Sequence, residues 1–268
     1  MRNKLFFLFI LIASSCSKNA SHHSIAVPDL IQAEKTRANI SGRILLYDGE
    51  NIAATDNSGI TVSIDNSTVT TQTGADGKWT LDSIPKGTYD ISYSKPGYGT
   101  GKIMGIFHAA TNHATTLIAR SESMNIVSSL DISNIKTASF SSATWLVNAI
   151  NLGLIRNGLF IEPIFNNPTS KNKPVRLFFS DKNVVSFSNY LVTEKIFTSG
   201  KDEVKETLTF DLKWFESKGF KLGQPVYIKA YGDGYKDDTY ENANNGLPVY
   251  PSLASSGSPT ISVVIPEK

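Results

Sequence analysis

Only one cysteine, Cys16, is present among the 268 residues of the chain. A disulfide within the chain is therefore excluded, and no residue after Cys16 can supply a thiol for nucleophilic catalysis or for a cysteine-based metal site. Histidine is also scarce: His22 and His23 are adjacent, whereas His108 and His113 have no carboxylate or cysteine between them. Neither pair has the further ligands, at suitable spacing, that a metal site requires.

Motifs of several enzyme classes and an excess of charge are missing as well. The sequence has no Gly-x-Ser-x-Gly, which places the nucleophile of many hydrolases, and no Gly-x-x-x-x-Gly-Lys-Ser/Thr phosphate loop. It has 26 basic and 24 acidic residues, and both numbers become 24 once Arg2 and Lys4 in the N-terminal segment are set aside. A neutral chain gives no electrostatic reason to expect a nucleic-acid partner.

Long hydrophobic runs are missing too, since the apolar run Leu5 to Ala13 has nine residues. A membrane-spanning helix needs about 20. Two basic residues precede the run and small residues follow it up to Cys16, which is similar to a bacterial lipoprotein signal with Ala13 where a typical lipobox has Leu. The similarity implies a signal peptide at residues 1–15 and a lipid on Cys16 that anchors the protein to the cell envelope, at the outer membrane. The alternative is an ordinary secretory signal with an incidental cysteine.

Short strand patterns begin after a polar tether that we assign to residues 16–37. Ile60, Val62 and Ile64 alternate with polar residues, and turn residues separate such runs up to about residue 120. Alternation of this kind places one face of a strand in a core and the other in water. The spacing predicts an antiparallel β-sandwich at residues 38–120. Asp76-Gly77 is expected to form the corner of a tight hairpin there, and not a metal or catalytic site.

A family resemblance rests on the same residues. The pattern is Gly-x-Val-like, then Thr-x-x-Asp-Gly-x-aromatic, Pro-x-Gly-x-Tyr and a closing Gly-Tyr, carried here by Gly42, Thr73, Asp76, Gly77, Trp79, Pro85, Gly87, Tyr89, Gly97 and Tyr98. It resembles the carboxypeptidase regulatory-like domain. The resemblance implies a transthyretin-like sandwich that serves as an accessory or recognition module without catalytic residues, with Trp79 and Tyr89 packed inward.

Residues 121–268 contain seven further strand-like runs and no firm motif. This pattern predicts a second sandwich of the immunoglobulin or fibronectin type, so the fold class is all-β with two antiparallel β-sandwich domains. The segment from Phe210 to Phe220 is expected to hold one short helical turn. The two-sandwich layout resembles surface lipoproteins of the Bacteroidetes type.

The connection at residues 232–252 is long and shows no strand pattern, which is typical of functional or mobile loops. Tyrosine, asparagine and glycine dominate it, as they do in antibody contact loops. We predict a partner-binding surface there, and its candidate residues are Tyr235, Tyr240, Tyr250, Asp237 and Asp238. Tyr235 and Tyr240 would point outward. The alternative is a loop that folds over its own sandwich and covers a core edge.

The same loop is acidic, and it raises the question of calcium. Aligned as an EF-hand from Asp233, it has Asp238 where glycine is required and Asn244 where the bidentate glutamate is required, so that motif is excluded. A calcium site of another kind near Asp233, Asp237 and Asp238 stays open, because their oxygens are suitable ligands. We otherwise expect no cofactor.

Three functions fit these observations. The first is a non-enzymatic, lipid-anchored envelope protein that binds a glycan or an envelope protein, or acts as a scaffold. The second is a passive spacer or assembly component. The third is a hydrolase of polysaccharide or peptide whose site has no recognisable motif. The all-β pattern and the missing catalytic signatures favour the first two, and we expect that the protein is not an enzyme.

Overall fold

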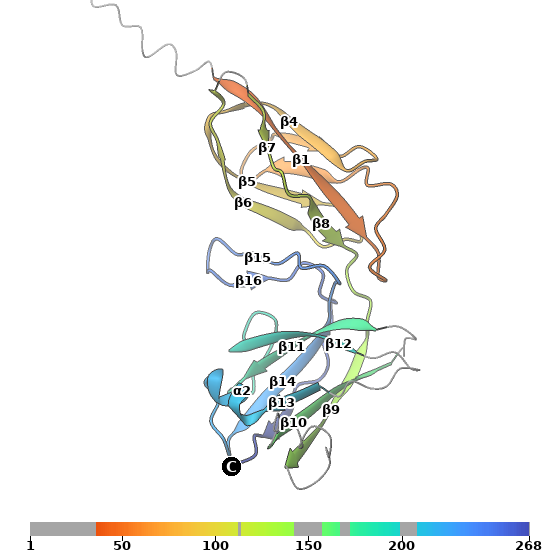
Figure 1. The fold of residues 1–268 in the computed structure, drawn as a ribbon, viewed down its shortest axis with the longest axis vertical. Coiled ribbons are helices and arrows are strands. Elements are labelled where there is room, and N and C mark those ends of the chain that lie inside the picture. The colour runs from red at the N-terminus through yellow and green to blue at the C-terminus, as the bar shows by residue number, and fades with distance from the viewer. Residues whose placement is uncertain (1–35, 112–113, 142–156, 167–171, 199–207, 268) are drawn as a thin grey trace, which may run out of the picture. The chain divides into compact units, whose positions relative to one another are not determined.

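The computed structural model describes residues 36–111, 114–141, 157–166, 172–198 and 208–267. Nearly all of its regular structure is β-strand (Figure 1). Cys16 and the predicted tether up to Lys35 lie outside the described residues.

The first group of strands forms two sheets. One sheet has the order β4-β1-β7, with β8 also paired to β1, and the other has the order β3-β2-β5-β6. The strands of the first sheet are β1 (Arg37–Tyr47), β4 (Lys78–Pro85), β7 (Thr116–Leu117) and β8 (Glu122–Asn125). Those of the second are β2 (Thr61–Ile64), β3 (Thr70–Gln72), β5 (Gly87–Ser94) and β6 (Gly101–His108). β7 and β8 follow one another along the same edge of β1, both parallel to it, so the sheet takes in residues beyond position 120.

A hydrophobic core joins these two sheets, and its buried residues alternate along the strands as the sequence predicts. Ile40, Ile44 and Leu46 of β1 are buried, and so are their counterparts in β2 and β5. Trp79 is 3% exposed and lies within this core, which confirms its inward packing. Tyr89 is half-buried against the same core, and its hydroxyl donates to the carbonyl of Pro85 at 2.8 Å.

The prediction of a hairpin at Asp76-Gly77 was wrong in its pairing. A turn is present, in which Gly77 has φ +78° and its N–H donates to the carbonyl of Gly74 at 2.9 Å. The strands on either side of it, β3 and β4, belong to different sheets, so the turn carries the chain across the core. A turn signal between two strand patterns does not say which sheet the second strand joins.

The second group of strands also forms two sheets, of orders β13-β10-β9 and β12-β11-β14-β17. The first consists of β9 (Ile132–Ser141), β10 (Asn157–Phe165) and β13 (Leu208–Asp211). The second consists of β11 (Lys173–Ser180), β12 (Val192–Thr198), β14 (Pro225–Gly232) and β17 (Ile261–Val264). All pairs within them are antiparallel. Two antiparallel β-sandwiches are thus confirmed as the fold class.

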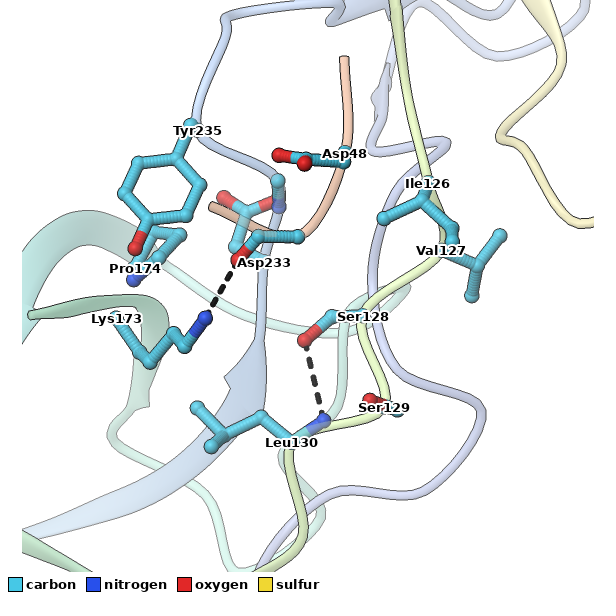
Figure 2. A pocket seen from close by; sticks show the side chains of 12 residues that line it. Asp48, Ile126, Val127, Ser128, Ser129, Leu130, Lys173, Pro174, Asp233 and Tyr235 are labelled. Atoms are coloured by element: carbon cyan, nitrogen blue, oxygen red, sulfur yellow. Dashed lines mark hydrogen bonds between the residues drawn. The ribbon is translucent and has the colours of Figure 1, made fainter. Parts of the chain in front are cut away.

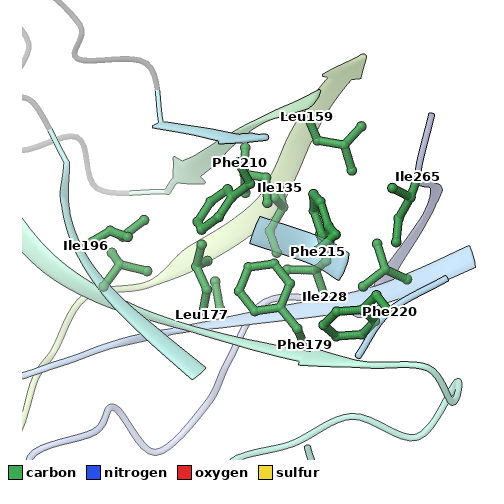
Figure 3. Packing of buried hydrophobic residues seen from close by; sticks show 14 of the residues in the cluster. Ile135, Leu159, Leu177, Phe179, Ile196, Phe210, Phe215, Phe220, Ile228 and Ile265 are labelled. Carbon is green, nitrogen blue, oxygen red and sulfur yellow. The ribbon is translucent and has the colours of Figure 1, made fainter. Parts of the chain in front are cut away.

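A second hydrophobic core fills this sandwich, in which aliphatic side chains surround the rings of Phe179, Phe210, Phe215 and Phe220 (Figure 3). Phe179 of β11 lies 5.4 Å from the ring of Phe210 in β13 and 5.1 Å from that of Trp214, measured between ring centroids. Trp214 belongs to α2 (Leu212–Ser217), the predicted helical turn. Asp211 caps this turn, because its carboxylate accepts a hydrogen bond from the N–H of Trp214 at 2.7 Å.

The long connection after β14 contains a small hairpin that the sequence did not predict. Its strands are β15 (Tyr240–Glu241) and β16 (Pro248–Val249), and they pair only with each other in the described part of the chain. Two-residue strands are too short for the alternation that reveals longer ones.

Candidate functional site

The site begins with the alternation of β11, the strand between β12 and β14. Val175, Leu177 and Phe179 point into the main core of the second sandwich. Successive side chains of a strand lie on opposite faces, so Arg176 and Phe178 lie on the outer face of this sheet. Both are nonetheless buried, Arg176 being 9% exposed, because the connection after β14 folds over them.

The register of the sheet places two cations side by side on this face. Arg176 pairs with Lys195 of β12 and, on its other side, with Tyr231 of β14. Like charges directly opposite one another repel. Asp233, which follows β14 and is 6% exposed, offsets the repulsion: its Oδ2 accepts a hydrogen bond from Arg176 Nε at 2.8 Å and lies 3.8 Å from Lys195 Nζ.

Lys195 is only partly compensated in this position. Its Nζ donates to the carbonyls of Tyr235 and Lys236 at the long distances of 3.2 and 3.4 Å. Burial lowers the pKa of its ammonium group, and Arg176 acts in the same direction, whereas Asp233 opposes both. The buried carboxylate of Asp233 is thus shared between the two cations, and Asp237 and Asp238 act on Lys195 in the same direction as Asp233.

An aromatic ring packs against the guanidinium group of Arg176. The guanidinium carbon lies 4.3 Å from the ring centroid of Tyr250, in a cation–π contact. Tyr250 is held in turn by its hydroxyl, which is 2.9 Å from that of Tyr190, and by an edge contact with Phe178 at 5.5 Å between centroids. Arg176 is thus fixed by Asp233 at Nε and by Tyr250 at its face.

These groups surround a cavity of about 430 Å³, which we call the Arg176 cleft. Its lining residues are Arg176, Lys195, Phe197, Tyr235, Asp237, Thr239, Pro248 and Tyr250. Phe197 is 48% exposed and Tyr235 half-buried, with ring centroids 6.0 Å apart. The Tyr235 hydroxyl donates to the carbonyl of Asn172. The cleft thus combines aromatic rings with a few charged and hydroxyl groups, as small-molecule sites commonly do.

Asp237 supplies a carboxylate at the exposed rim of this cleft. Its Oδ1 accepts a hydrogen bond from the N–H of Thr239 at 3.3 Å. Partial burial acts to raise its pKa, but the hydrogen bonds from Thr239 and the charges of Lys195 and Arg176 outweigh it, so the pKa is lowered. A carboxylate at this position is ionised at neutral pH and can accept hydrogen bonds from a ligand.

The structure brings only three of the five predicted contact residues to the cleft. Tyr235, Tyr250 and Asp237 line it, whereas Tyr240 lies in β15 with its ring 5.9 Å from Lys102 Nζ. Asp238 points elsewhere: its Oδ2 accepts hydrogen bonds from Asn125 Nδ2 at 2.8 Å and from the hydroxyl of Ser252. Burial raises the pKa of Asp238, and these hydrogen bonds lower it only in part.

Sequence reasoning missed Arg176, Lys195 and Phe197 because they come from strands and not from the loop. A signal for Arg176 was present, since "KPVRLFFS" has a cation in the middle of an apolar run. A buried strand tolerates such a residue only where a partner compensates its charge. The partner, Asp233, is 57 positions away, and only the pairing of β11 with β14 reveals it.

A smaller cavity of about 290 Å³ shares Tyr235 with the cleft and is also lined by Asp233 (Figure 2). Lys173 reaches this cavity and donates from Nζ to the carbonyl of Gly49 at 2.5 Å. The hydroxyl of Ser128 accepts a hydrogen bond from the N–H of Leu130 at 3.3 Å (Figure 2). Apart from Lys173, Asp233 and Asp48 its lining carries no charged side chain in the described part.

The three carboxylates considered for calcium each have other partners. Asp233 is paired with Arg176, Asp237 accepts from Thr239, and Asp238 accepts from Asn125 and Ser252. Within the described residues, no group of three or more His, Cys, Asp or Glu side chains is placed to hold a metal ion. The calcium site stays an untested prediction. None of the helices in the described ranges has the length and apolar character needed to cross a bilayer.

Comparison with known families concerns the first sandwich. Residues 39–119 match the family model of the carboxypeptidase regulatory-like domain. The resemblance drawn from the sequence is confirmed. The regulatory-like segment is remote from Arg176, Lys195 and Tyr250 in sequence, so this family assigns no role to the cleft. No curated protein matches the chain.

Several solved structures show likeness at low identity. A Bacteroides uniformis protein described as a candidate carbohydrate-binding protein is 12% identical, with 85% of this chain and 98% of that one covered and a TM-score of 0.28. A DUF3823 family protein from Parabacteroides merdae is 13% identical, with the same coverages and a TM-score of 0.27. A mutant type II cohesin–X-dockerin complex from Acetivibrio cellulolyticus is 21% identical, and its match covers 34% of this chain at a TM-score of 0.29.

The chain spans 58% and 56% of the length of two cohesin–X-dockerin matches, so it corresponds to only part of them. TM-scores this low define no shared site. The function of the cleft must therefore be argued from its own side chains.

Proposed function

We propose that the protein is a non-enzymatic binding protein of the cell envelope, anchored to the outer membrane through a lipid on Cys16, and that the Arg176 cleft binds a glycan. The anchor rests on the signal-like segment that ends at Cys16. The binding role rests on the cleft, where the exposed ring of Phe197 and the half-buried ring of Tyr235 lie beside charged groups in one cavity.

A sugar ring matches that combination of surfaces. Its C–H groups form an apolar face that packs against an aromatic ring, and its hydroxyls need directed hydrogen-bond partners. Phe197 and Tyr235 supply the rings, and Arg176 and Asp237 supply a donor and an acceptor within the same cavity. Phe197 differs from other exposed phenylalanines such as Phe187 because it lines a cavity together with Tyr235 and Arg176, an arrangement that a passive spacer does not require.

The test is a glycan panel, screened with the purified full chain in detergent. We expect at least one glycan to bind, and Phe197→Ala combined with Tyr235→Ala to weaken its affinity about tenfold or more, equivalent to about 1.4 kcal/mol. Phe187→Ala is the matched control, because Phe187 is similarly exposed at 51% but does not line the cleft.

The competing roles give different results in the same assay. If no glycan binds, the spacer or the protein-binding role gains support and the present proposal fails. If a glycan binds and Phe187→Ala weakens it as much as the paired variant, the binding surface lies outside the cleft.

A further inference from the structure

We infer that the ligand of the Arg176 cleft is a carboxylate-bearing saccharide, of the kind found in polymers of uronic acids. This inference rests on the proposed function and specifies its ligand. Three observations carry it: the unused donors of Arg176, the second cation Lys195 beside it, and the aromatic and hydroxyl groups around the cleft.

Arg176 has donors to spare although it is nine-tenths buried. Its Nε is engaged by Asp233, but Nη1 and Nη2 make no hydrogen bond to any described residue. These two nitrogens are not among the buried side-chain atoms that lack a partner, so they are accessible from the cleft and free to donate to a ligand. The residue lines the cleft, where a ligand can supply an acceptor.

Two cations and two carboxylates meet at the cleft. Arg176 and Lys195 contribute two positive charges there, and the buried Asp233 contributes one negative charge that they share. Asp237 contributes a second negative charge from the exposed side of the cleft: it makes no ion pair with either cation in the described part of the chain, but their charges lower its pKa. A ligand carboxylate that reaches the terminal nitrogens of Arg176 would accept charge-assisted hydrogen bonds, which are stronger in a partly desolvated site than in water.

The geometry of the guanidinium favours a planar anion. Asp233 holds Nε, and Tyr250 covers one face at 4.3 Å, so the group cannot turn freely. A fixed guanidinium presents its terminal nitrogens as a fork, which matches the two oxygens of a carboxylate. Lysine in its place would offer a point charge without that directional match.

The rest of the lining distinguishes a saccharide from an acidic peptide. Asp237 and Thr239 present an acceptor and a hydroxyl on the side of the cleft that faces solvent, and Phe197 and Tyr235 present rings. A uronic acid carries a carboxylate, hydroxyls and an apolar ring face on a single unit. A glutamate or aspartate side chain brings only the carboxylate and would leave the remaining groups without partners.

The experiment measures binding of tetragalacturonic acid and of its methyl ester to the full chain in detergent, by calorimetry. The two probes share one backbone and differ in charge. We expect the acid to bind at least tenfold more tightly than the ester, and this preference to shrink as sodium chloride rises from about 50 to about 500 mM. A tetraglutamate peptide of equal charge should bind at least tenfold more weakly than the acid.

A paired variant tests whether Arg176 is the residue responsible. Arg176→Gln with Asp233→Asn replaces the buried ion pair by two amides and leaves the net charge of the protein unchanged. We expect it to lose the preference for the acid. Lys229→Gln is the control, because it removes a cation from β14 that does not line the cleft, and it should keep the preference.

The possible outcomes separate this inference from the proposed function. Equal binding of acid and ester, or binding of neutral glycans from the panel alone, overturns the inference and leaves the proposed function in place. Absence of any glycan ligand overturns both. Equal binding of tetraglutamate overturns the saccharide assignment, and a preference that persists in the paired variant overturns the role of Arg176. If that variant does not fold, the comparison of acid, ester and peptide on the unaltered chain still tests whether the ligand is a carboxylate-bearing saccharide.

Discussion

Arg176 stacks on Tyr250, with its guanidinium carbon 4.3 Å from the ring centroid, while its Nε donates to Asp233. The stack joins the central strand of the second sandwich to the far end of the long connection after β14. One residue of a buried strand thus organises the loop that covers it. The charge that makes Arg176 useful to a ligand is the same charge that the sandwich must neutralise in order to fold.

Removal of Arg176 should be costly for stability. Arg176→Ala leaves Asp233 buried at 6% exposure without its 2.8 Å partner, and loss of one member of a buried ion pair costs about 3 to 5 kcal/mol. Urea unfolding followed by fluorescence measures this change in the free energy of unfolding. Lys229→Ala on the neighbouring strand serves as control and should cost less than about 1 kcal/mol. A similarly small cost for Arg176→Ala would show that Lys195 neutralises Asp233 by itself.

The stability of the first sandwich should depend on the close contact between Gly42 and the ring of Trp79. Trp79 is 3% exposed, and its truncation to alanine is expected to cost about 3 to 5 kcal/mol. A Cβ at Gly42 would lie 2.7 Å from Cζ2 of the Trp79 ring, so Gly42→Ala crowds a buried ring and should cost about 1 to 3 kcal/mol.

Gly49→Ala is the matched control for this pair. A Cβ there would have ordinary contact with Ile126 at 3.8 Å. Its free energy of unfolding should stay within about 0.5 kcal/mol of the unaltered chain, as for most surface changes. If Gly42→Ala and Gly49→Ala change the free energy of unfolding equally, the tight contact between Gly42 and the indole of Trp79 is contradicted.

The lipid anchor gives a prediction that depends on the sequence alone. Cys16→Ser removes the only thiol, so the protein should move from the membrane fraction to the soluble fraction. Stable anchoring requires two acyl chains or a chain with a second signal, and each buried CH₂ contributes about 0.8 kcal/mol. Immunoblotting of fractions washed with high salt measures the distribution. A Cys16→Ser protein that stays with membranes after the wash contradicts lipid anchoring.

Much of the architecture could be predicted from local patterns. The alternation of Ile60, Val62 and Ile64 gives a strand with one buried face, and the segment from Phe210 to Phe220 holds the expected helical turn. Pairing was harder to predict, because it depends on contacts between distant segments. The turn at Asp76-Gly77 was recognised, yet the strands beside it join different sheets.

The candidate site depends even more on contacts between segments that are distant in the sequence. Composition alone pointed to the tyrosines of the connection after β14, and Tyr235 and Tyr250 do line the cleft. The direction in which each side chain points depends on the folding of that connection, which places Tyr240 near Lys102 instead. Arg176 and Lys195 become neighbours only through the register of β11 with β12, which no local pattern contains.

Asp238 should make stability depend on pH. Burial raises the pKa of this carboxyl in the folded chain, although hydrogen bonds from Ser252 and Asn125 act against the rise. In the unfolded chain its pKa is about 3.9. Between the two values the folded chain holds more protons than the unfolded chain, so the contribution of Asp238 to stability falls as pH rises through this window and is constant above the folded pKa.

Asp238→Asn removes this titration and keeps an oxygen that can accept from Asn125 and Ser252. The variant should therefore gain stability relative to the unaltered chain as pH rises from about 4, and the gain should level off once the folded carboxyl is ionised. Asp237→Asn is the control, because Asp237 is exposed and its pKa is shifted downward. The stability of this variant relative to the unaltered chain should therefore not increase as pH rises. Urea unfolding at a series of pH values measures both differences. An Asp238→Asn difference that is flat across that range would show that the carboxyl is ionised in the folded chain at no cost, and that the hydrogen bonds from Asn125 and Ser252 outweigh its burial.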